Sequence, residues 1–121
     1  INNSKNLIFG GYANNSWSQN SGPSPGSFLY SLRTGDDLSP FKSQLKDEND
    51  HHAVNSFLDE GPSFGYRGID LFIADHAGSN NRSFSKLGYT YKTPPYVHTP
   101  FYPLAGSFNF TPSEIEVLYL N

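Results

Sequence analysis

The chain of 121 residues contains no cysteine. Without a thiol it forms no disulfide scaffold, thiolate zinc site or iron–sulfur cluster, and it has no cysteine nucleophile. No apolar run approaches the roughly 20 residues that a membrane-spanning helix requires. The eight Lys and Arg residues are scattered along the sequence, so no basic patch for nucleic acid is visible. We therefore expect neither nucleic-acid binding nor membrane insertion.

Small and turn-forming residues are abundant, since Gly, Pro, Ser and Asn together account for 48 positions. This composition leaves little room for long helices and favours turns between short strands. Mixed or alternating apolar patterns indicate strands over 7–9, 27–32, 69–73, 108–110 and 115–120. Because no helical pattern alternates with these segments, we predict a single domain over 1–121, mainly β, folded as an antiparallel β-sandwich.

Two glycines surround an aromatic residue in the segment that contains Gly61, Phe64 and Gly65. This arrangement indicates positive φ angles or a close approach of the backbone to its neighbours. A phosphate-binding loop would need a helix after the glycines, whereas a strand is predicted over 69–73. The glycines are therefore interpreted as structural, and no cofactor is expected.

Three carboxylates have both a catalytic and a structural interpretation. Glu114 and Glu116 are two apart on the last predicted strand, so they would share a face and could act as an acid/base or metal pair. Alternatively, Glu116 accepts hydrogen bonds from an arginine or from loop N–H groups. Asp70 lies on a predicted strand, and a partly buried carboxylate there must find a donor. We favour the structural interpretation for all three and expect no metal.

Neither of the two loop histidines, His76 and His98, has a nucleophile motif such as G-x-S-x-G beside it. We therefore expect no catalytic residues. The only tryptophan, Trp17, either anchors its own loop at the mouth of the sandwich or forms an interface hot spot, where tryptophan is enriched.

Six short motifs occur in order along the chain. They are FGGY at 9–12 followed by Trp17, GSFLYSL at 26–32, GPSFG at 61–65 leading to DLFIAD at 70–75, SFSKLGYTY at 83–91, LAGS at 104–107 and EIEV at 114–117. Together they resemble the TLDc domain of the oxidation-resistance and nuclear-receptor-coactivator proteins. The resemblance implies a two-sheet β-sandwich with a few short helices.

The resemblance covers about the C-terminal three-quarters of a full TLDc domain. The family's first segment, which precedes the FGGY motif, has no counterpart in residues 1–6. Methionine is absent and the sequence begins at Ile1, so we expect a partial domain whose N-terminal part is missing.

The family resemblance also implies a function. It points to a non-enzymatic protein-interaction module of a larger intracellular protein, with roles in oxidative-stress resistance and in binding the vacuolar proton pump, the V-ATPase. Its expected partners are proteins, V-ATPase subunits among them, and its expected location is cytoplasmic or at a membrane through a partner. The residues expected to serve interaction or structure are Trp17, Gly61, Phe64, Gly65, Asp70, Glu114 and Glu116.

Three other functions stay open. A structural docking piece of a large assembly would fit a partial domain. A carbohydrate-binding β-sandwich would use the 19 aromatic residues together with the Asn- and Asp-rich loops. An enzyme would have to use Asp70, Glu114 or Glu116.

Overall fold

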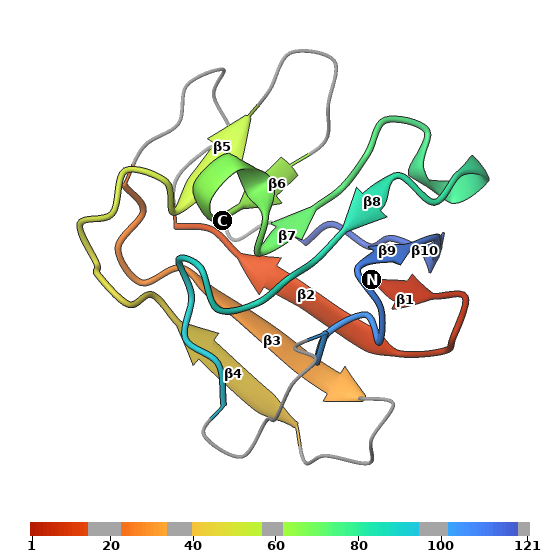
Figure 1. Cartoon of the computed structure of the whole chain (residues 1–121), viewed down its shortest axis with the longest axis horizontal. Helices are drawn as coiled ribbons and strands as arrows, with labels where there is room; N and C mark the ends of the chain where they lie inside the picture. The colour runs from red at the N-terminus through yellow and green to blue at the C-terminus, as the bar shows by residue number, and fades with distance from the viewer. Residues whose placement is uncertain (15–22, 34–39, 57–61, 95–101, 119–121) are drawn as a thin grey trace.

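The structure is a computed structural model that describes residues 1–14, 23–33, 40–56, 62–94 and 102–118 (Figure 1). These residues form two antiparallel five-stranded sheets. Helix within the described residues is limited to two short 3-10 turns. The predicted mainly β class and the two-sheet β-sandwich are therefore confirmed. Trp17 and Gly61 lie outside the described residues.

The first sheet has the strand order β10-β1-β2-β3-β4. Its centre is the pair β2–β3, in which Phe9 and Leu29 point into the core and are fully buried. The outward neighbours Phe28 and Tyr30 are only half-buried, as the period-2 geometry of a strand requires. The strands are β1 (Asn2–Asn3), β2 (Ile8–Tyr12), β3 (Phe28–Arg33), β4 (Phe41–Gln44) and β10 (Pro112–Glu114).

The second sheet follows the chain order β5-β6-β7-β8-β9. Figure 1 shows it stacked across the first sheet. Its inward side chains include Phe64, Leu71 and Phe110, all buried. The strands are β5 (Val54–Ser56), β6 (Pro62–Phe64), β7 (Leu71–Phe72), β8 (Ser83–Phe84) and β9 (Asn109–Phe110), with the 3-10 turns η1 (Tyr66–Gly68) and η2 (Ala77–Ser79) on either side of β7.

Aromatic contacts join the two sheets. The ring of Phe9 in β2 meets that of Phe110 in β9 edge to face at 5.1 Å between centroids. Gly11, also in β2, faces Phe64, and a Cβ atom there would come within 2.5 Å of the ring. The absence of a side chain at Gly11 thus lets the second sheet approach the first, and burial of these rings supplies much of the hydrophobic stabilisation.

The strand predicted over 115–120 is wrong over its described part. β10 ends at Glu114, and residues 115–118 form no strand and are exposed. Ile115 and Val117 do alternate with polar or differently facing residues in the sequence. However, the pairing of β10 with β1 ends at Glu114, which pairs with Asn2, so no β1 residue is left to pair with 115–118. The predicted strand over 69–73 is shortened to β7, whereas 7–9 and 27–32 correspond to β2 and β3.

Candidate functional site

Asp70 is the most deeply buried carboxylate of the described chain, with no exposed surface. Its two oxygens accept hydrogen bonds from four consecutive backbone N–H groups. The N···O distances are 3.2 Å from Gly88, 3.2 Å from Tyr89, 3.0 Å from Thr90 and 3.1 Å from Tyr91. The expectation that Asp70 must find donors is therefore confirmed, and the donors come from a loop rather than from an arginine.

Burial raises the pKa of Asp70 to about 6, and the N–H groups of Tyr91, Thr90, Gly88 and Tyr89 offset part of that rise. Removal from water disfavours a charged carboxylate, while donors that point at it favour the charge. In the part of the chain that the structure covers, the one ion pair joins Asp75 to His76 at 3.5 Å, on the surface. Asp70 is thus held by backbone dipoles rather than by a counter-charge.

Gly65 lies directly against this carboxylate. Its φ is 92°, which confirms the predicted positive φ. Its N–H donates to the carbonyl of Ala53 at 3.1 Å, and its own carbonyl accepts from Nδ2 of Asn55 at 2.5 Å. The neighbouring Phe64 points the other way, into the core, where it meets Tyr91 edge to face at 6.1 Å. Phe64, Gly65 and Asp70 are therefore brought together as structural residues.

Tyr91 completes the connection between these segments. Its side chain is fully buried, and its hydroxyl donates to the carbonyl of Ala53 at 2.7 Å. Burial, followed by the charge of Asp70, raises its pKa far above the usual range. Oγ1 of Thr90 accepts the N–H of Tyr66 at 2.9 Å. We call the set Ala53, Asn55, Gly65, Asp70 and 88–91 the Asp70 network.

Sequence reasoning identified Asp70 and Gly65 but missed Thr90 and Tyr91. Backbone donors carry no residue-type signal, because every residue except proline has an N–H. The TY pair at 90–91 was available only as part of a family motif, not as a chemical pattern.

Four exposed residues belong to or adjoin the segments of the Asp70 network. Tyr66 is 40% exposed and Tyr89 is 54% exposed. The guanidinium carbon of Arg67 lies 5.3 Å from the centroid of the Tyr66 ring, and Lys86 is also exposed. We call Tyr66, Arg67, Lys86 and Tyr89 the tyrosine–cation patch. It contains no buried titratable group, so its chemistry is that of contact and charge.

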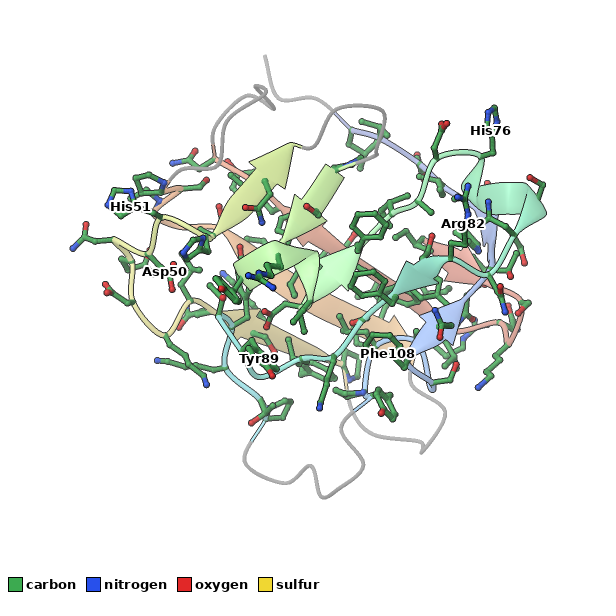
Figure 2. All side chains as sticks on the ribbon, turned by 45° about the horizontal axis from the view of Figure 1, so that its top comes forward. Asp50, His51, His76, Arg82, Tyr89 and Phe108 are labelled. Carbon is green, nitrogen blue, oxygen red and sulfur yellow. The ribbon has the colours of Figure 1, made fainter. Side chains whose placement is uncertain are left out.

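An aromatic stack lies on the outer side of the second sheet. Phe72 and Phe84 are direct cross-strand partners, with parallel rings 4.7 Å apart, and Phe108 stacks on Phe84 at 5.1 Å. Tyr102 meets Phe108 edge to face at 6.3 Å. Figure 2 places Phe108 on the same side of the molecule as Tyr89. The stack therefore extends the apolar part of this face.

The predicted carboxylate pair does not share a strand face. Glu114 is the last residue of β10 and Glu116 follows it in irregular structure, and both are exposed. The expectation that Glu116 is satisfied by a buried donor is wrong, because the strand that would have buried it does not form.

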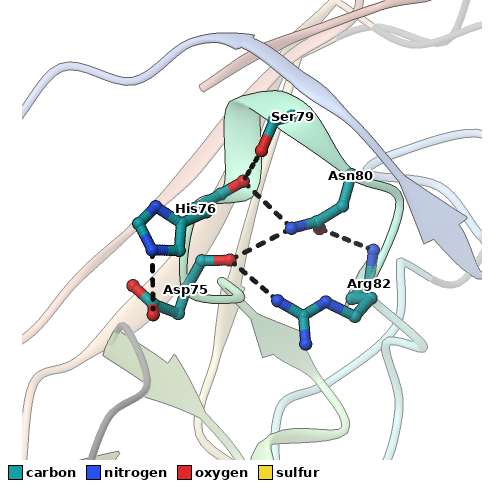
Figure 3. Close-up of polar contacts among 5 residues, drawn as sticks. All are labelled: Asp75, His76, Ser79, Asn80 and Arg82. Carbon is teal, nitrogen blue, oxygen red and sulfur yellow. Dashed lines mark hydrogen bonds and ion pairs between the residues drawn. The ribbon is translucent and has the colours of Figure 1, made fainter.

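The loop from Asp75 to Arg82 uses its polar groups within itself (Figure 3). The carbonyl of Asp75 accepts from Nδ2 of Asn80 at 3.1 Å and from a guanidinium nitrogen of Arg82 at 3.3 Å. The carbonyl of His76, whose φ is 51°, accepts from Oγ of Ser79 at 2.9 Å and from Nδ2 of Asn80 at 3.0 Å. The loop is thus a self-supported turn.

Within the described ranges, no three His, Asp or Glu side chains come together in a group that could hold a metal ion. No helix of these ranges is long and apolar enough to cross a membrane. The family model of the TLDc domain matches residues 1–121. No curated protein and no solved structure matches the chain.

Proposed function

Because this chain belongs to the TLDc domain family, we propose that it acts as a non-enzymatic protein-interaction module. By resemblance to the family, the proposed partner is the V-ATPase and the proposed cellular role is resistance to oxidative stress. The module would then work in the cytoplasm or at a membrane through its partner, as part of a larger protein.

The observation that carries this proposal is how Asp70 is used. A general acid or base must reach the proton that it transfers, whereas Asp70 is fully buried and accepts four backbone N–H groups. Among the described residues, Asp70 is the carboxylate whose pKa is shifted most, and its oxygens are thus already used to hold a loop. Tyr89 belongs to that loop, and Tyr66 is hydrogen-bonded to it through Thr90; both are exposed. Tyrosine, and the arginine that packs on Tyr66, are residue types enriched in protein interfaces.

The carbohydrate-binding alternative has weaker support. Sugars pack against the free faces of aromatic rings. On the outer sheet face, Phe72 covers one face of Phe84 and Phe108 covers the other, with interplanar angles of 10°. The central ring of the stack therefore presents only its edges.

The test is retention of purified V-ATPase by the immobilised 121-residue chain. We expect the native chain to retain the pump, and a heat-denatured sample of the same chain not to retain it. Equal retention by native and denatured chain, or none by either, would contradict the proposal. Binding to a glycan array without V-ATPase retention would favour the carbohydrate alternative.

A further inference from the structure

Charge is distributed unevenly along the chain. The segment 62–94 contains four of the eight Lys and Arg residues but only two of the eleven Asp and Glu residues. One of these two carboxylates is Asp70, which is buried. The four cations are all exposed. The surface of this segment is thus cationic in a chain whose formal net charge is −3.

The Asp70 network brings part of this charge together with exposed tyrosines. The N–H of Lys86 donates to the carbonyl of Ile69 at 2.8 Å, and the N–H of Tyr66 donates to Thr90 at 2.9 Å. Segments 66–69 and 86–90 therefore run side by side, so the four exposed residues of the tyrosine–cation patch come from adjoining stretches of backbone. Arg82 is not part of it, because Figure 2 shows Arg82 at the end of the molecule opposite to Asp50 and His51.

Contacts within the chain fix the position of the tyrosine–cation patch without a partner. Tyr89 donates its own N–H to Asp70, and Tyr66 begins the 3-10 turn that follows Gly65. The Tyr66 ring is packed on one side by Arg67 and on another by the His52 ring, 4.8 Å away edge to face. Preorganised side chains lose less conformational entropy on binding than mobile ones. Tyrosine and arginine are also the residue types that contribute most in interfaces.

An acidic turn limits the patch on one side. Oδ1 of Asp50 accepts the N–H of His52 at 2.8 Å, and the His52 ring contacts the Tyr66 ring. The acidic residues Asp47, Glu48 and Asp50 therefore lie in the turn that leads directly to the Tyr66 end of the patch. An anionic partner would be repelled there and attracted over Arg67 and Lys86. The positive charges of the patch therefore favour a negatively charged partner, and the acidic turn directs that partner toward Arg67 and Lys86.

We propose that the tyrosine–cation patch binds an acidic segment of the partner protein that also carries aromatic or aliphatic side chains. The carboxylates of that segment pair with Arg67 and Lys86, and its apolar side chains pack on Tyr66 and Tyr89. This assignment rests on the proposed function and adds to it the chemistry of the partner and the surface that recognises it.

The first experiment uses a fluorescein-labelled peptide of four Glu-Glu-Phe repeats and the whole 121-residue chain. Fluorescence anisotropy gives the dissociation constant. A Gln-Gln-Phe peptide separates the effect of charge from that of the rings. Vesicles of phosphatidylcholine with phosphatidylserine test an anionic membrane as the alternative ligand.

The matched variants are Arg67→Glu/Lys86→Glu on the patch and, away from it, Lys5→Glu/Arg33→Glu. Lys5 lies in the turn between β1 and β2 and Arg33 ends β3, and both are exposed. Both change the net charge equally. We expect the patch variant to bind the acidic peptide at least tenfold more weakly, the control to stay within twofold of the parent, and parental binding to weaken as salt rises. The single variant Lys86→Glu replaces the double variant if the latter melts at a lower temperature.

Three outcomes would overturn the assignment. They are equal losses in the patch and control variants, binding of the glutamine peptide as tightly as the glutamate peptide, and binding of vesicles without binding of the peptide. V-ATPase retention separates these failures from a failure of the proposed function. If the patch variant retains the pump as well as the parent does, only the surface assignment is wrong; if the parent retains none, the proposed function is wrong.

Discussion

A Cβ atom on Gly65 would lie 2.7 Å from Cγ of Asp70. The turn η1 folds the chain back between these residues, so the carboxylate occupies the space that a side chain at 65 would need. Gly65 is thus required twice, by its positive φ and by its contact with Asp70. Gly65 directly follows strand β6 and precedes Tyr66, and Asp70 accepts the N–H groups of the loop 88–91, which includes Tyr89. The contact between Gly65 and Asp70 therefore links β6 to this loop and to both exposed tyrosines.

We expect Gly65→Ala to lower the free energy of unfolding more than a positive φ alone requires. With φ 92° and ψ 173°, Gly65 lies in a backbone region that essentially only glycine occupies, where a residue with a side chain costs on the order of 1–3 kcal/mol, and the collision with Asp70 adds to that. Urea denaturation measures the difference. Gly26→Ala is the matched control, because Gly26 has a φ of 85° and nothing within 4 Å of a Cβ atom. Equal losses at the two positions would show that the contact with Asp70 has no energetic weight.

Asp70→Asn should destabilise the loop 88–91. An asparagine keeps one acceptor oxygen but turns an NH2 group toward backbone N–H donors, and a buried donor without an acceptor costs about 1–3 kcal/mol. Hydrogen exchange at the amides of 88–91 should quicken first. Asp75→Asn is the exposed control and should change neither exchange nor stability. Unchanged protection at 88–91 in the Asp70 variant would contradict the role assigned to the carboxylate.

The stability of the chain should depend on pH through Asp70. Its pKa is about 6 in the folded chain against an ordinary value of 3.8, so as the pH falls the folded chain binds this proton at a higher pH than the unfolded chain does. The Asp70 contribution to the free energy of unfolding is therefore fully present below about pH 4 and is lost as the pH rises through about 6. The difference between the parent and Asp70→Asn, measured in thermal melts from pH 4 to pH 7, isolates this contribution. A difference that does not change across this range would be incompatible with the raised pKa.

Glu116→Gln and Glu116→Ala should behave alike. The side chain is exposed and follows the end of β10, and substitutions at such positions usually change stability by less than about 0.5 kcal/mol. Thermal melts of both variants test this. A clear loss in the alanine variant with none in the glutamine variant would mean that Glu116 has a buried donor after all.

Sequence patterns predicted the centre of the sandwich better than its edges. β2 and β3 carry runs of large apolar and aromatic side chains, and the hydrophobic burial of Phe9 and Leu29 fixes their register. The edge strands β4, with the sequence FKSQ, and β5, with the sequence VNS, consist largely of polar residues and were not predicted. Each has one large apolar side chain in three or four residues, which leaves little local signal, since propensity in strands depends on context.

The candidate site was predictable only in part. The need of Asp70 for donors and the positive φ of Gly65 follow from residue chemistry alone. That the donors belong to 88–91 depends on tertiary packing. For the segment 115–118 the prediction was wrong because the local pattern was present and the tertiary partner was not. Its alternation predicts a strand, but no neighbouring strand pairs with it beyond Glu114.

The affinity of the chain for purified V-ATPase, compared between the parent and Arg67→Glu/Lys86→Glu, tests the central claim most directly. We expect saturable binding by the parent with a dissociation constant of about 10 μM or tighter, and a loss of at least tenfold in the variant, which corresponds to about 1.4 kcal/mol. Both proteins must melt at the same temperature. Absence of saturable binding by the folded parent would contradict the claim that this domain is an interaction module for the pump.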